Sequence, residues 1–258
     1  MIRTVTMSST LAAFTVLERI ARDQPVGLSE LARNLDLPKS TVQRCLATLH
    51  EAGWIETESA GSRRWVLAMH AFAVAVTVIE RAGLRDRALP VMSQLSAETG
   101  ETIHLAIPDG QEIVLVERID SPHTLRAASA VGSRSPLHAS SNGKAVLAVL
   151  PEEELRSYLS HGLSQVTRHT LTDEATLRAD LEQTRSQGYA VNHEELQDGV
   201  VSVASAIRAR NGQPVASLSI SGPRDRMPEA TVQAYGPLVV RAASDISKRL
   251  LPYEPFSS

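Results

Sequence analysis

Few residues of this chain have the types and the spacing of a catalytic centre. Glu194 and Glu195 could act as an acid–base pair, but adjacent residues of a strand point to opposite faces, so a strand end in solvent is the better interpretation. Gly143 and Lys144 resemble the end of a phosphate-binding loop, yet no glycine precedes them at the required interval. The sequence also has no Gly-x-Ser-x-Gly nucleophile elbow. We therefore expect no enzyme activity and no catalytic residues.

Metal binding is not indicated either. None of the eight histidines stands three or four residues from another, the spacing that puts two ligands on one helix face. Cys45 is the single cysteine, which permits no internal disulfide and no multi-cysteine metal site, and which suits the reducing cytoplasm. We expect no metal site and no cofactor.

Small polar residues gather in two places that could bind a small ligand. In the expected strand 215–221 the serines alternate with apolar residues, so that Ser217, Ser219 and Ser221 share one face. Residues 140–143 open an expected helix, where free backbone N–H groups favour an anion and Gly143 allows close approach. A small carboxylate, or another polar molecule, fits both features. The solvent-exposed face of a sheet would give the same serine pattern.

The expected helix over residues 39–52 has two different faces. Its outer face is small and polar near the helix N-terminus and carries one arginine, which suits entry into a DNA major groove. Short side chains allow close approach, hydroxyls reach phosphates, and Arg or Gln reads base edges. An ordinary solvent-facing helix is the alternative. The outer face holds Ser40, Arg44 and Ala47, flanked by Thr41 and Gln43, and the inward face holds Val42, Cys45, Leu46 and Leu49.

The elements around this helix predict a winged helix-turn-helix. A first helix carries the apolar stripe Leu11, Phe14, Leu17 and Ile20, and Ser29 is an expected N-cap for a short second helix.

Residues 54–56 and 65–67 are β-prone runs around a turn at 59–62, which predicts a hairpin with Arg63 and Arg64 near its tip. These wing arginines would contact phosphate or the minor groove, and the alternative for them is solvated surface charge.

The rest of the chain mixes helical and strand periodicity, which predicts an α+β domain. We expect helices over residues 88–100, 142–149, 151–160, 173–187 and 228–251, and strands over residues 103–107, 112–119, 189–192, 200–207 and 215–221.

Composition limits the class of protein. The chain has 258 residues, 43% hydrophobic and 21% charged, which is typical of a globular protein with a real core. Aromatic residues make up 3%, so a single-strand binder built on aromatic stacking is not expected. We see no secretory signal and no apolar run of about 18 residues that would span a membrane. The net charge of −3 does not indicate a nucleic-acid binder, so any basic surface is local.

Four blocks of sequence, in order, resemble the IclR family of bacterial transcription regulators. The first block runs from Leu28-Ser-Glu-Leu-Ala-Arg through Leu37-Pro-Lys-Ser-Thr-Val-Gln-Arg44 to Leu49-His-Glu-Ala-Gly53. The others are Pro136-Leu-His-Ala-Ser-Ser-Asn-Gly-Lys-Ala145, Gly188-Tyr-Ala-Val and Ser219-Ile-Ser-Gly-Pro223, so the resemblance covers nearly the whole chain.

The resemblance implies a division of the chain and an effector site. It implies a winged helix-turn-helix DNA-binding domain over 8–68, a linker helix over 69–85 that packs on a second subunit, a GAF-like α+β effector-binding domain over 86–252, and a tail over 253–258. Carried over by position, the effector contacts are Ser141, Asn142, Asn192, Ser202, Ser219 and Ser221, with Thr124 and Ala127 in the wall.

Two of these positions depart from the family pattern and put the effector's identity in doubt. Asn192 stands where relatives commonly have an acid, and Ser202 stands where they often have a cysteine.

We therefore expect a cytoplasmic, ligand-responsive transcription regulator, either repressor or activator. It would bind a partly palindromic double-stranded DNA operator as a homodimer or homotetramer, through Lys39, Ser40, Thr41, Gln43, Arg44, Arg63 and Arg64. A small effector, which we expect to carry a carboxylate, would modulate the affinity of the protein for DNA. The alternatives are an enzyme that processes a small molecule, and a ligand sensor whose helix-turn-helix contacts protein instead of DNA.

Overall fold

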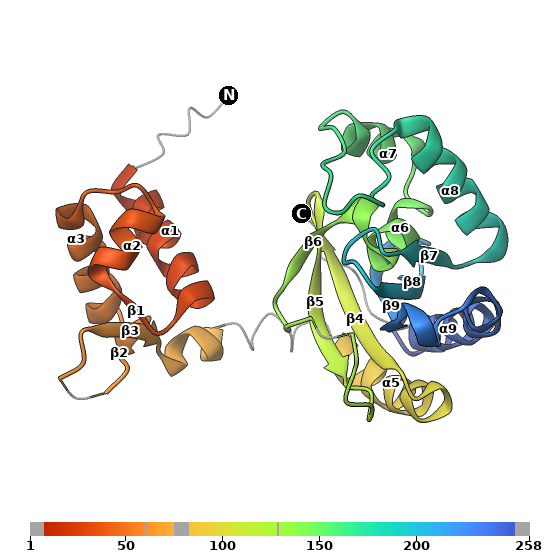
Figure 1. Cartoon of the computed structure of the whole chain (residues 1–258), viewed down its shortest axis with the longest axis horizontal. Helices are drawn as coiled ribbons and strands as arrows, with labels where there is room; N and C mark the ends of the chain where they lie inside the picture. Colours follow the sequence, from red (N-terminus) through yellow and green to blue (C-terminus); the bar gives the residue numbers. More distant parts are fainter. Residues whose placement is uncertain (1–7, 60, 75–82, 128, 251–258) are drawn as a thin grey trace. The chain divides into compact units, whose positions relative to one another are not determined.

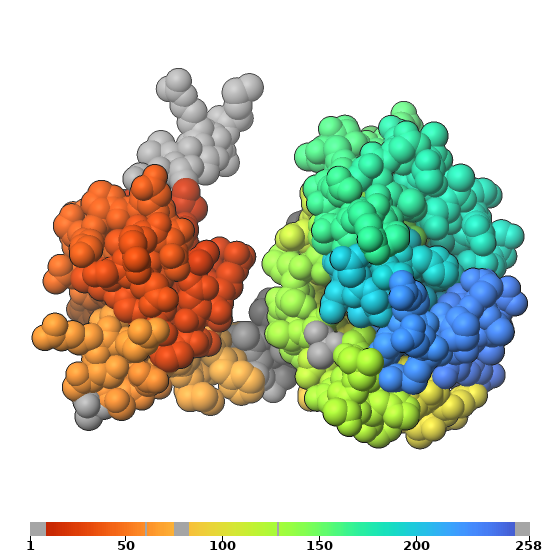
Figure 2. All heavy atoms as spheres, in the orientation of Figure 1, coloured from red at the N-terminus to blue at the C-terminus, as the bar shows by residue number. Residues whose placement is uncertain are grey.

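The computed structural model describes residues 8–59, 61–74, 83–127 and 129–250. The chain divides into two units, Met1–Ala82 and Gly83–Ser258 (Figure 1). In the space-filling view, the N-terminal unit runs from red to orange and the C-terminal unit from yellow to blue (Figure 2). Of the described residues, no helix is both long enough and apolar enough to cross a membrane.

The N-terminal unit contains the predicted helices and hairpin. Its strands form a sheet in the order β1-β3-β2, with β2 and β3 antiparallel. Strand β1 was not expected from the sequence, because two residues are too few to show a periodicity. The elements are α1 (Ser8–Asp23), β1 (Val26–Gly27), α2 (Leu28–Asn34), α3 (Lys39–Glu51), β2 (Ile55–Thr57) and β3 (Arg64–Leu67).

The core of this unit confirms the inward face of α3 and corrects that of α1. Val42, Cys45, Leu46 and Leu49 are all buried, as predicted. Leu11 and Phe14, however, are 57% and 53% exposed, whereas Val16 and Ile20 are fully buried. The sequence of α1 carries two overlapping helical stripes, and packing against α3 selects the one through residues 13, 16 and 20.

The N-cap prediction for the second helix is wrong. Helix α2 begins one residue before Ser29, and Gly27 occupies the cap position without a side-chain hydrogen bond. Gly27 also pairs with Arg64 in the sheet, so the chain passes from strand to helix with no residue left between them.

The predicted linker helix is described in part. Residues 69–74 are helical, whereas residues 75–82, which include Val76 and Ile79 of the expected stripe, lie outside the described residues. Gly83 has a φ of +53°, and α5 begins at Leu84, so residues 83–85 do not continue the linker helix. The expected tail at 253–258 also lies outside the described residues.

The C-terminal unit is built on one antiparallel sheet in the order β6-β5-β4-β9-β8-β7. The expected α+β architecture is confirmed, and β6 is an element the sequence did not predict. The strands are β4 (Thr102–Asp109), β5 (Glu112–Ile119), β6 (Arg134–Pro136), β7 (Ala190–His193), β8 (Val200–Arg208) and β9 (Pro214–Pro223). The helices are α5 (Leu84–Thr99), η1 (Leu137–Ala139), α6 (Ser141–Leu147), α7 (Glu152–Leu159), α8 (Glu174–Gln187), η2 (Arg224–Arg226) and α9 (Glu229–Arg249).

Helices cover both faces of this sheet. Helices α5 and α9 pack together on one face, and α6 lies against β8 and β9 on the other, followed by α8 and α7 (Figure 1). The apolar residues of β9 point toward α5 and α9, and its serines point toward α6. Both faces are therefore inside the unit.

At Gly143, helix α6 packs directly against the backbone of η1. A Cβ at this position would lie 2.2 Å from the carbonyl oxygen of Leu137 in η1. The sequence suggested that this glycine lets a ligand come close, but the group that comes close is the backbone of η1.

Gly143→Ala should therefore destabilise the C-terminal unit by about 2 kcal/mol or more, because backbone rather than a movable side chain must shift. Both tryptophans, Trp54 and Trp65, lie in the N-terminal unit, so urea unfolding followed by circular dichroism and by tryptophan fluorescence separates the two units.

The matched control is Gly212→Asn, in an open turn where φ is +84° and asparagine is tolerated. It should cost less than about 1 kcal/mol. Equal losses for the two variants would contradict the close approach at Gly143.

Candidate nucleic-acid interface and ligand pocket

The outer face of α3 presents polar side chains to solvent. Lys39, Ser40, Gln43 and Arg44 are exposed, and Thr41 is half-buried. They lie on the first two turns of a helix whose opposite face is held in the core, so their positions are fixed by packing. A rigid helix with a short, polar, cationic outer face has what a major groove requires.

The two arginines of the hairpin differ in their surroundings. Arg63 is exposed beside the turn. Arg64 is turned back: its Nε donates to the carbonyl oxygen of Pro25 at 3.0 Å, its Nη2 donates to the same oxygen, and Glu30 lies 3.5 Å away. Arg64 thus ties the hairpin to the start of α2, a role the sequence did not suggest.

The C-terminal unit contains a partly open cavity of about 70 Å³ beneath the start of α6. Six of the eight predicted effector residues line it: Ala127, Ser141, Asn142, Asn192, Ser202 and Ser221. The structure does not bring Thr124 to the cavity, because that residue is exposed in the loop after β5. Ser219 is fully buried and lies behind Asn142, whose Nδ2 donates to its hydroxyl at 2.9 Å.

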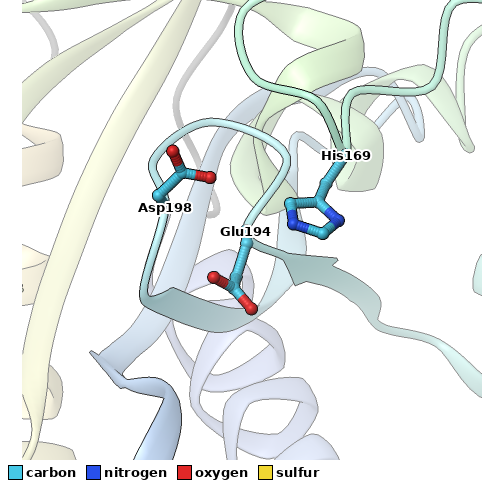
Figure 3. A group of neighbouring side chains, drawn as sticks. All are labelled: His169, Glu194 and Asp198. Atoms are coloured by element: carbon cyan, nitrogen blue, oxygen red, sulfur yellow. The ribbon is translucent and has the colours of Figure 1, made fainter.

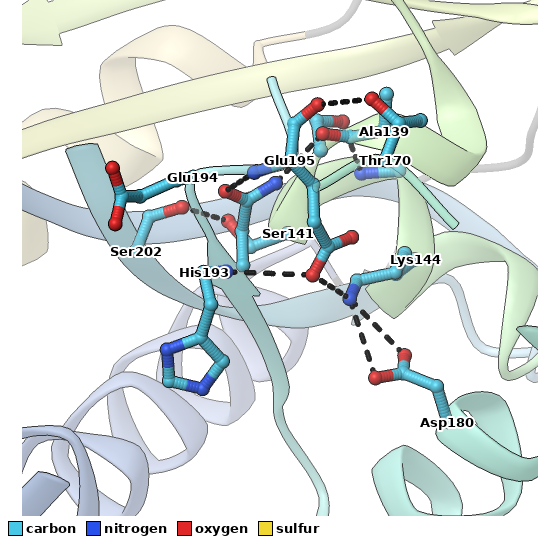
Figure 4. A network of polar contacts seen from close by, with 12 residues as sticks. Ala139, Ser141, Lys144, Thr170, Asp180, His193, Glu194, Glu195 and Ser202 are labelled. Carbon is cyan, nitrogen blue, oxygen red and sulfur yellow. Dashed lines mark hydrogen bonds and ion pairs between the residues drawn. The ribbon is translucent and has the colours of Figure 1, made fainter. Parts of the chain in front are cut away.

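The serine face of the sheet is buried. Ser217 and Ser219 are fully buried and Ser221 is 5% exposed, so the alternative of an exposed sheet face is wrong. Some hydroxyls on this side of the sheet hydrogen-bond inside the unit, such as those of Ser141 and Ser202, whose oxygens lie 2.7 Å apart (Figure 4). Buried hydroxyls of this kind provide polar groups without placing a charge in the cavity.

Asn192 holds the cavity wall together. Its Nδ2 donates to the carbonyl oxygen of Ala139 at 2.7 Å, and its Oδ1 accepts from the backbone N–H of Glu195 at 3.2 Å. The amide therefore joins β7 to η1 and to the loop 194–199, which contributes Leu196 and Gln197 to the lining.

His104 is a cavity residue that the sequence analysis missed. It lies on β4, 6% exposed, with Nδ1 3.2 Å from the hydroxyl oxygen of Ser221. Burial and, to a lesser degree, the nearby Arg118 cation lower the pKa of its imidazole to about 4, so the ring is neutral at physiological pH. The available signal was the second face of the strand at 103–107, where His104 and Ala106 alternate with the apolar residues.

The prediction that Glu194 and Glu195 lie at a strand end in solvent is wrong, because both are buried. Glu194 has a φ of +63°, which turns the chain inward just after β7. Its carboxylate accepts from the backbone N–H of Gly199 at 2.7 Å and pairs with Arg224 at 3.1 Å, and these contacts lower its pKa.

Glu195 pairs with a lysine inside the protein. Lys144 of α6 is fully buried, with its Nζ 2.8 Å from the Oε1 of Glu195 and 3.2 Å from Asp180 of α8 (Figure 4). Burial raises the pKa of Glu195 and the Lys144 ammonium counteracts this. Thr170 also donates to the carbonyl oxygen of Glu195 at 2.7 Å. The loop that forms one wall of the cavity is thereby tied to α6 and α8.

His169, Glu194 and Asp198 form a group whose ligand atoms lie within 4.8 Å of one another (Figure 3). His169 and Asp198 are exposed. Both carboxylate oxygens of Glu194 already accept hydrogen bonds, one of them from a guanidinium. A cation there would face the positive charge of Arg224, so the donor set is a poor fit for a metal ion.

Two family models match the chain. One, described as the IclR helix-turn-helix domain, matches residues 11–59, and the other, described as bacterial transcriptional regulator IclR C-terminal, matches residues 76–248. The HTH-type transcriptional repressor AllR of Escherichia coli (strain K12) is 41% identical over 224 residues, which are 86% of this chain and 82% of that protein. The HTH-type transcriptional regulator BhcR of Paracoccus denitrificans is 36% identical over 241 residues, 93% of this chain and 86% of that protein.

Solved structures are similar over nearly the whole length. The crystal structure of the Thermotoga maritima IclR has a TM-score of 0.77 and 30% identity, covering 95% of this chain and 99% of that one. An IclR homolog from Microbacterium hydrocarbonoxydans, complexed with 4-hydroxybenzoate, has a TM-score of 0.80 and 27% identity, covering 94% of this chain and 99% of that one.

Lys144→Met should lower the free energy of unfolding of the C-terminal unit by about 3–5 kcal/mol, because it leaves Glu195 buried without its cation. Adding Glu195→Gln should recover part of the loss, since the unpaired charge is then gone. Urea unfolding followed by circular dichroism measures both.

The control is Lys248→Met, whose side chain is 70% exposed beside Asp245 and which should change stability by less than about 0.5 kcal/mol. If Lys144→Met lowers the free energy of unfolding by no more than Lys248→Met does, the ion pair between Lys144 and Glu195 does not hold the loop 194–199 in place.

Proposed function

Because the chain belongs to the IclR family of bacterial transcriptional regulators, we propose that α3 reads the major groove of an operator and that the cavity under α6 binds a small carboxylate effector. The chain is a DNA-binding regulator that responds to a small molecule, and its family is one of regulators rather than enzymes. The alternative of an enzyme that processes a small molecule is therefore not favoured. We place the protein in the cytoplasm, where a regulator meets its DNA.

The proposed DNA contacts divide into base reading and backbone contact. Arg44 and Gln43 lie on the exposed face of α3 and carry the donors that read base edges. Ser40 and Thr41 lie near the helix N-terminus and suit phosphate oxygens, and Lys39 adds a positive charge there. On the wing, Arg63 is free to reach the backbone, whereas Arg64 supports the hairpin from behind. The observation that carries this proposal is the exposed polar face of a helix fixed by its buried side.

We propose that the protein acts as a homodimer or a homotetramer. One helix-turn-helix touches few base pairs, so useful affinity requires two modules on a partly palindromic site. Large apolar side chains at the surface support association: Met69 and Phe72 are 72% and 61% exposed on the helical segment 69–74.

The size and lining of the cavity support a small effector. About 70 Å³ is roughly half the ~150 Å³ of a cavity that admits benzene, so a molecule of a few heavy atoms fits. The related protein complexed with 4-hydroxybenzoate binds a carboxylate. This supports a carboxylate effector here as well, with fewer heavy atoms than 4-hydroxybenzoate. The effector would act by binding the DNA-competent and DNA-incompetent arrangements with different affinities.

Arg44→Ala should weaken operator binding by about 1–3 kcal/mol and relax selectivity at one base pair, because the arginine supplies a base contact. Fluorescence anisotropy with DNA from upstream of the gene, beside a scrambled duplex, measures both at two salt concentrations. Arg22→Ala, an exposed arginine at the end of α1, is the control and should leave selectivity unchanged. Unaltered affinity and selectivity in the Arg44 variant would remove α3 from the role of recognition helix.

Ser202→Val should weaken effector binding about tenfold or more while operator affinity stays the same, because it removes a hydroxyl from the cavity and puts two methyl groups in its place. A panel of short-chain carboxylic acids, added to the protein–DNA complex in the same anisotropy assay, supplies the response.

Ser205→Ala is the matched control on the same strand. Ser205 faces away from the cavity and donates to the carbonyl oxygen of Gly188, so the variant should respond normally. An unchanged response in the Ser202 variant would place the effector elsewhere.

A further inference from the structure

An anion that enters the cavity meets no formal charge on its lining. The lining residues within the described ranges are small, apolar or neutral polar, and Lys144 beneath them is taken up by Glu195 and Asp180. A carboxylate buried without a counterion loses its hydration, and no opposite charge offsets the cost in free energy. A cavity for anions therefore needs a group that becomes positive when the anion arrives.

His104 is the titratable residue of that lining. Its Nδ1 is engaged by Ser221, and its buried Nε2 has no hydrogen-bond partner among the described residues. A buried ring nitrogen without a partner is costly unless a ligand supplies one.

The groups around His104 leave its ring neutral while the cavity is empty. Beside it on β5 stands Arg118, which opposes a second positive charge but is itself paired with Asp120 at 2.7 Å. The neighbouring strand β9 presents Ser219 and Ser221, and α6 presents Asn142, none of which titrates. The pKa of about 4 reflects burial first, then Arg118, with Asp120 acting in the opposite direction.

We propose that His104 is the counterion of the effector: it is neutral in the empty cavity and takes up a proton from solvent when a carboxylate binds at its Nε2. Both ring nitrogens are then donors, with Nδ1–H donating to Ser221 and Nε2–H donating to the ligand. The inference rests on the proposed carboxylate effector and gives that site its source of charge.

A second atom without a partner narrows the ligand class. Asn142 donates through Nδ2 to Ser219, and its buried Oδ1 accepts from no group in the described part of the chain. An oxygen in this state can accept from a ligand donor, and protonated His104 can donate to a ligand acceptor. A small hydroxy acid has both, with its hydroxyl for Asn142 and its carboxylate for His104.

Proton uptake makes binding depend on pH in a defined direction. The pKa of His104 is about 4 without ligand and is raised by the ligand's negative charge. Between these two pKa values, each bound carboxylate brings one proton with it. Affinity therefore falls as pH rises, by up to about tenfold per unit, and levels off above the pKa of the complex. A neutral amide of the same shape shows no such dependence.

The test uses the full chain with lactate, glycolate and acetate as probes, and lactamide as the uncharged analogue of lactate. Calorimetry between about pH 5.5 and pH 7.5, in buffers of different ionisation enthalpy, gives the affinity and the number of protons taken up. NMR of the imidazole gives the pKa of His104 directly, with and without lactate. We expect lactate affinity to fall at least tenfold over this range, lactamide affinity to stay constant, and the pKa of His104 to rise with lactate.

His104→Gln keeps a donor near the position of Nε2 but cannot take up a proton. It should bind lactate without pH dependence. His123→Gln is the control, since that histidine is exposed and outside the cavity lining, and it should keep the full pH dependence.

Two outcomes overturn the inference and are distinguishable. If the acids bind in the cavity but with pH-independent affinity and no change in the pKa of His104, then His104 is not the counterion, while the proposed effector site stands. If no acid of the panel perturbs His104 or the protein–DNA complex, the carboxylate effector and the role of His104 fail together.

Discussion

The ion pair between Lys144 and Glu195 fixes the distance between α6 and the loop that follows β7, and both of these line the proposed ligand cavity. A lysine with no exposed surface is held only if carboxylates accept from it at short range, and here Glu195 does so at 2.8 Å. The same pair brings Leu196 and Gln197 to the cavity and places Ser141 and Asn142 opposite them. Gly143 completes this arrangement, because any side chain there would push α6 off η1.

The C-terminal unit buries hydroxyls and amides where a usual core has apolar side chains. Each such group must find a partner, and most do within the unit: Ser141 with Ser202, Asn142 with Ser219, and Asn192 with Ala139. Among the buried atoms of the described residues left without a partner, Nε2 of His104 and Oδ1 of Asn142 belong to residues that line the cavity, so they bear on the proposed ligand. The N-terminal unit distributes its polar groups differently. Its core is apolar, and its polar groups are displayed on the outer face of α3.

In a regulator of this kind, effector binding by one unit and DNA binding by the other are connected through a coupling free energy. An effector changes DNA affinity only as far as it binds two arrangements of the protein differently. The cavity is lined by elements from distant parts of the sequence, among them β4, β5, α6, the loop 194–199, β8 and β9, so the proposed ligand, by bonding their free polar atoms, would stabilise one arrangement of these elements.

The sequence by itself determined most of the longer elements and their order, because helical and strand periodicities record which face of each element is buried, whereas the short strands β1 and β6 were not predicted. The inward face of α3, the hairpin and the alternation of serines along β9 were predicted from the sequence pattern, and the family resemblance implied six of the residues that line the cavity. The tertiary structure alone decided which of two stripes α1 buries, that Arg64 turns back to Pro25, and that Glu195 meets Lys144 inside the protein. It also decided that His104 lies beside Ser221, 117 positions apart in the chain. Local periodicity shows which face of an element is buried, whereas the partner of a buried polar group depends on which distant segment folding brings against it.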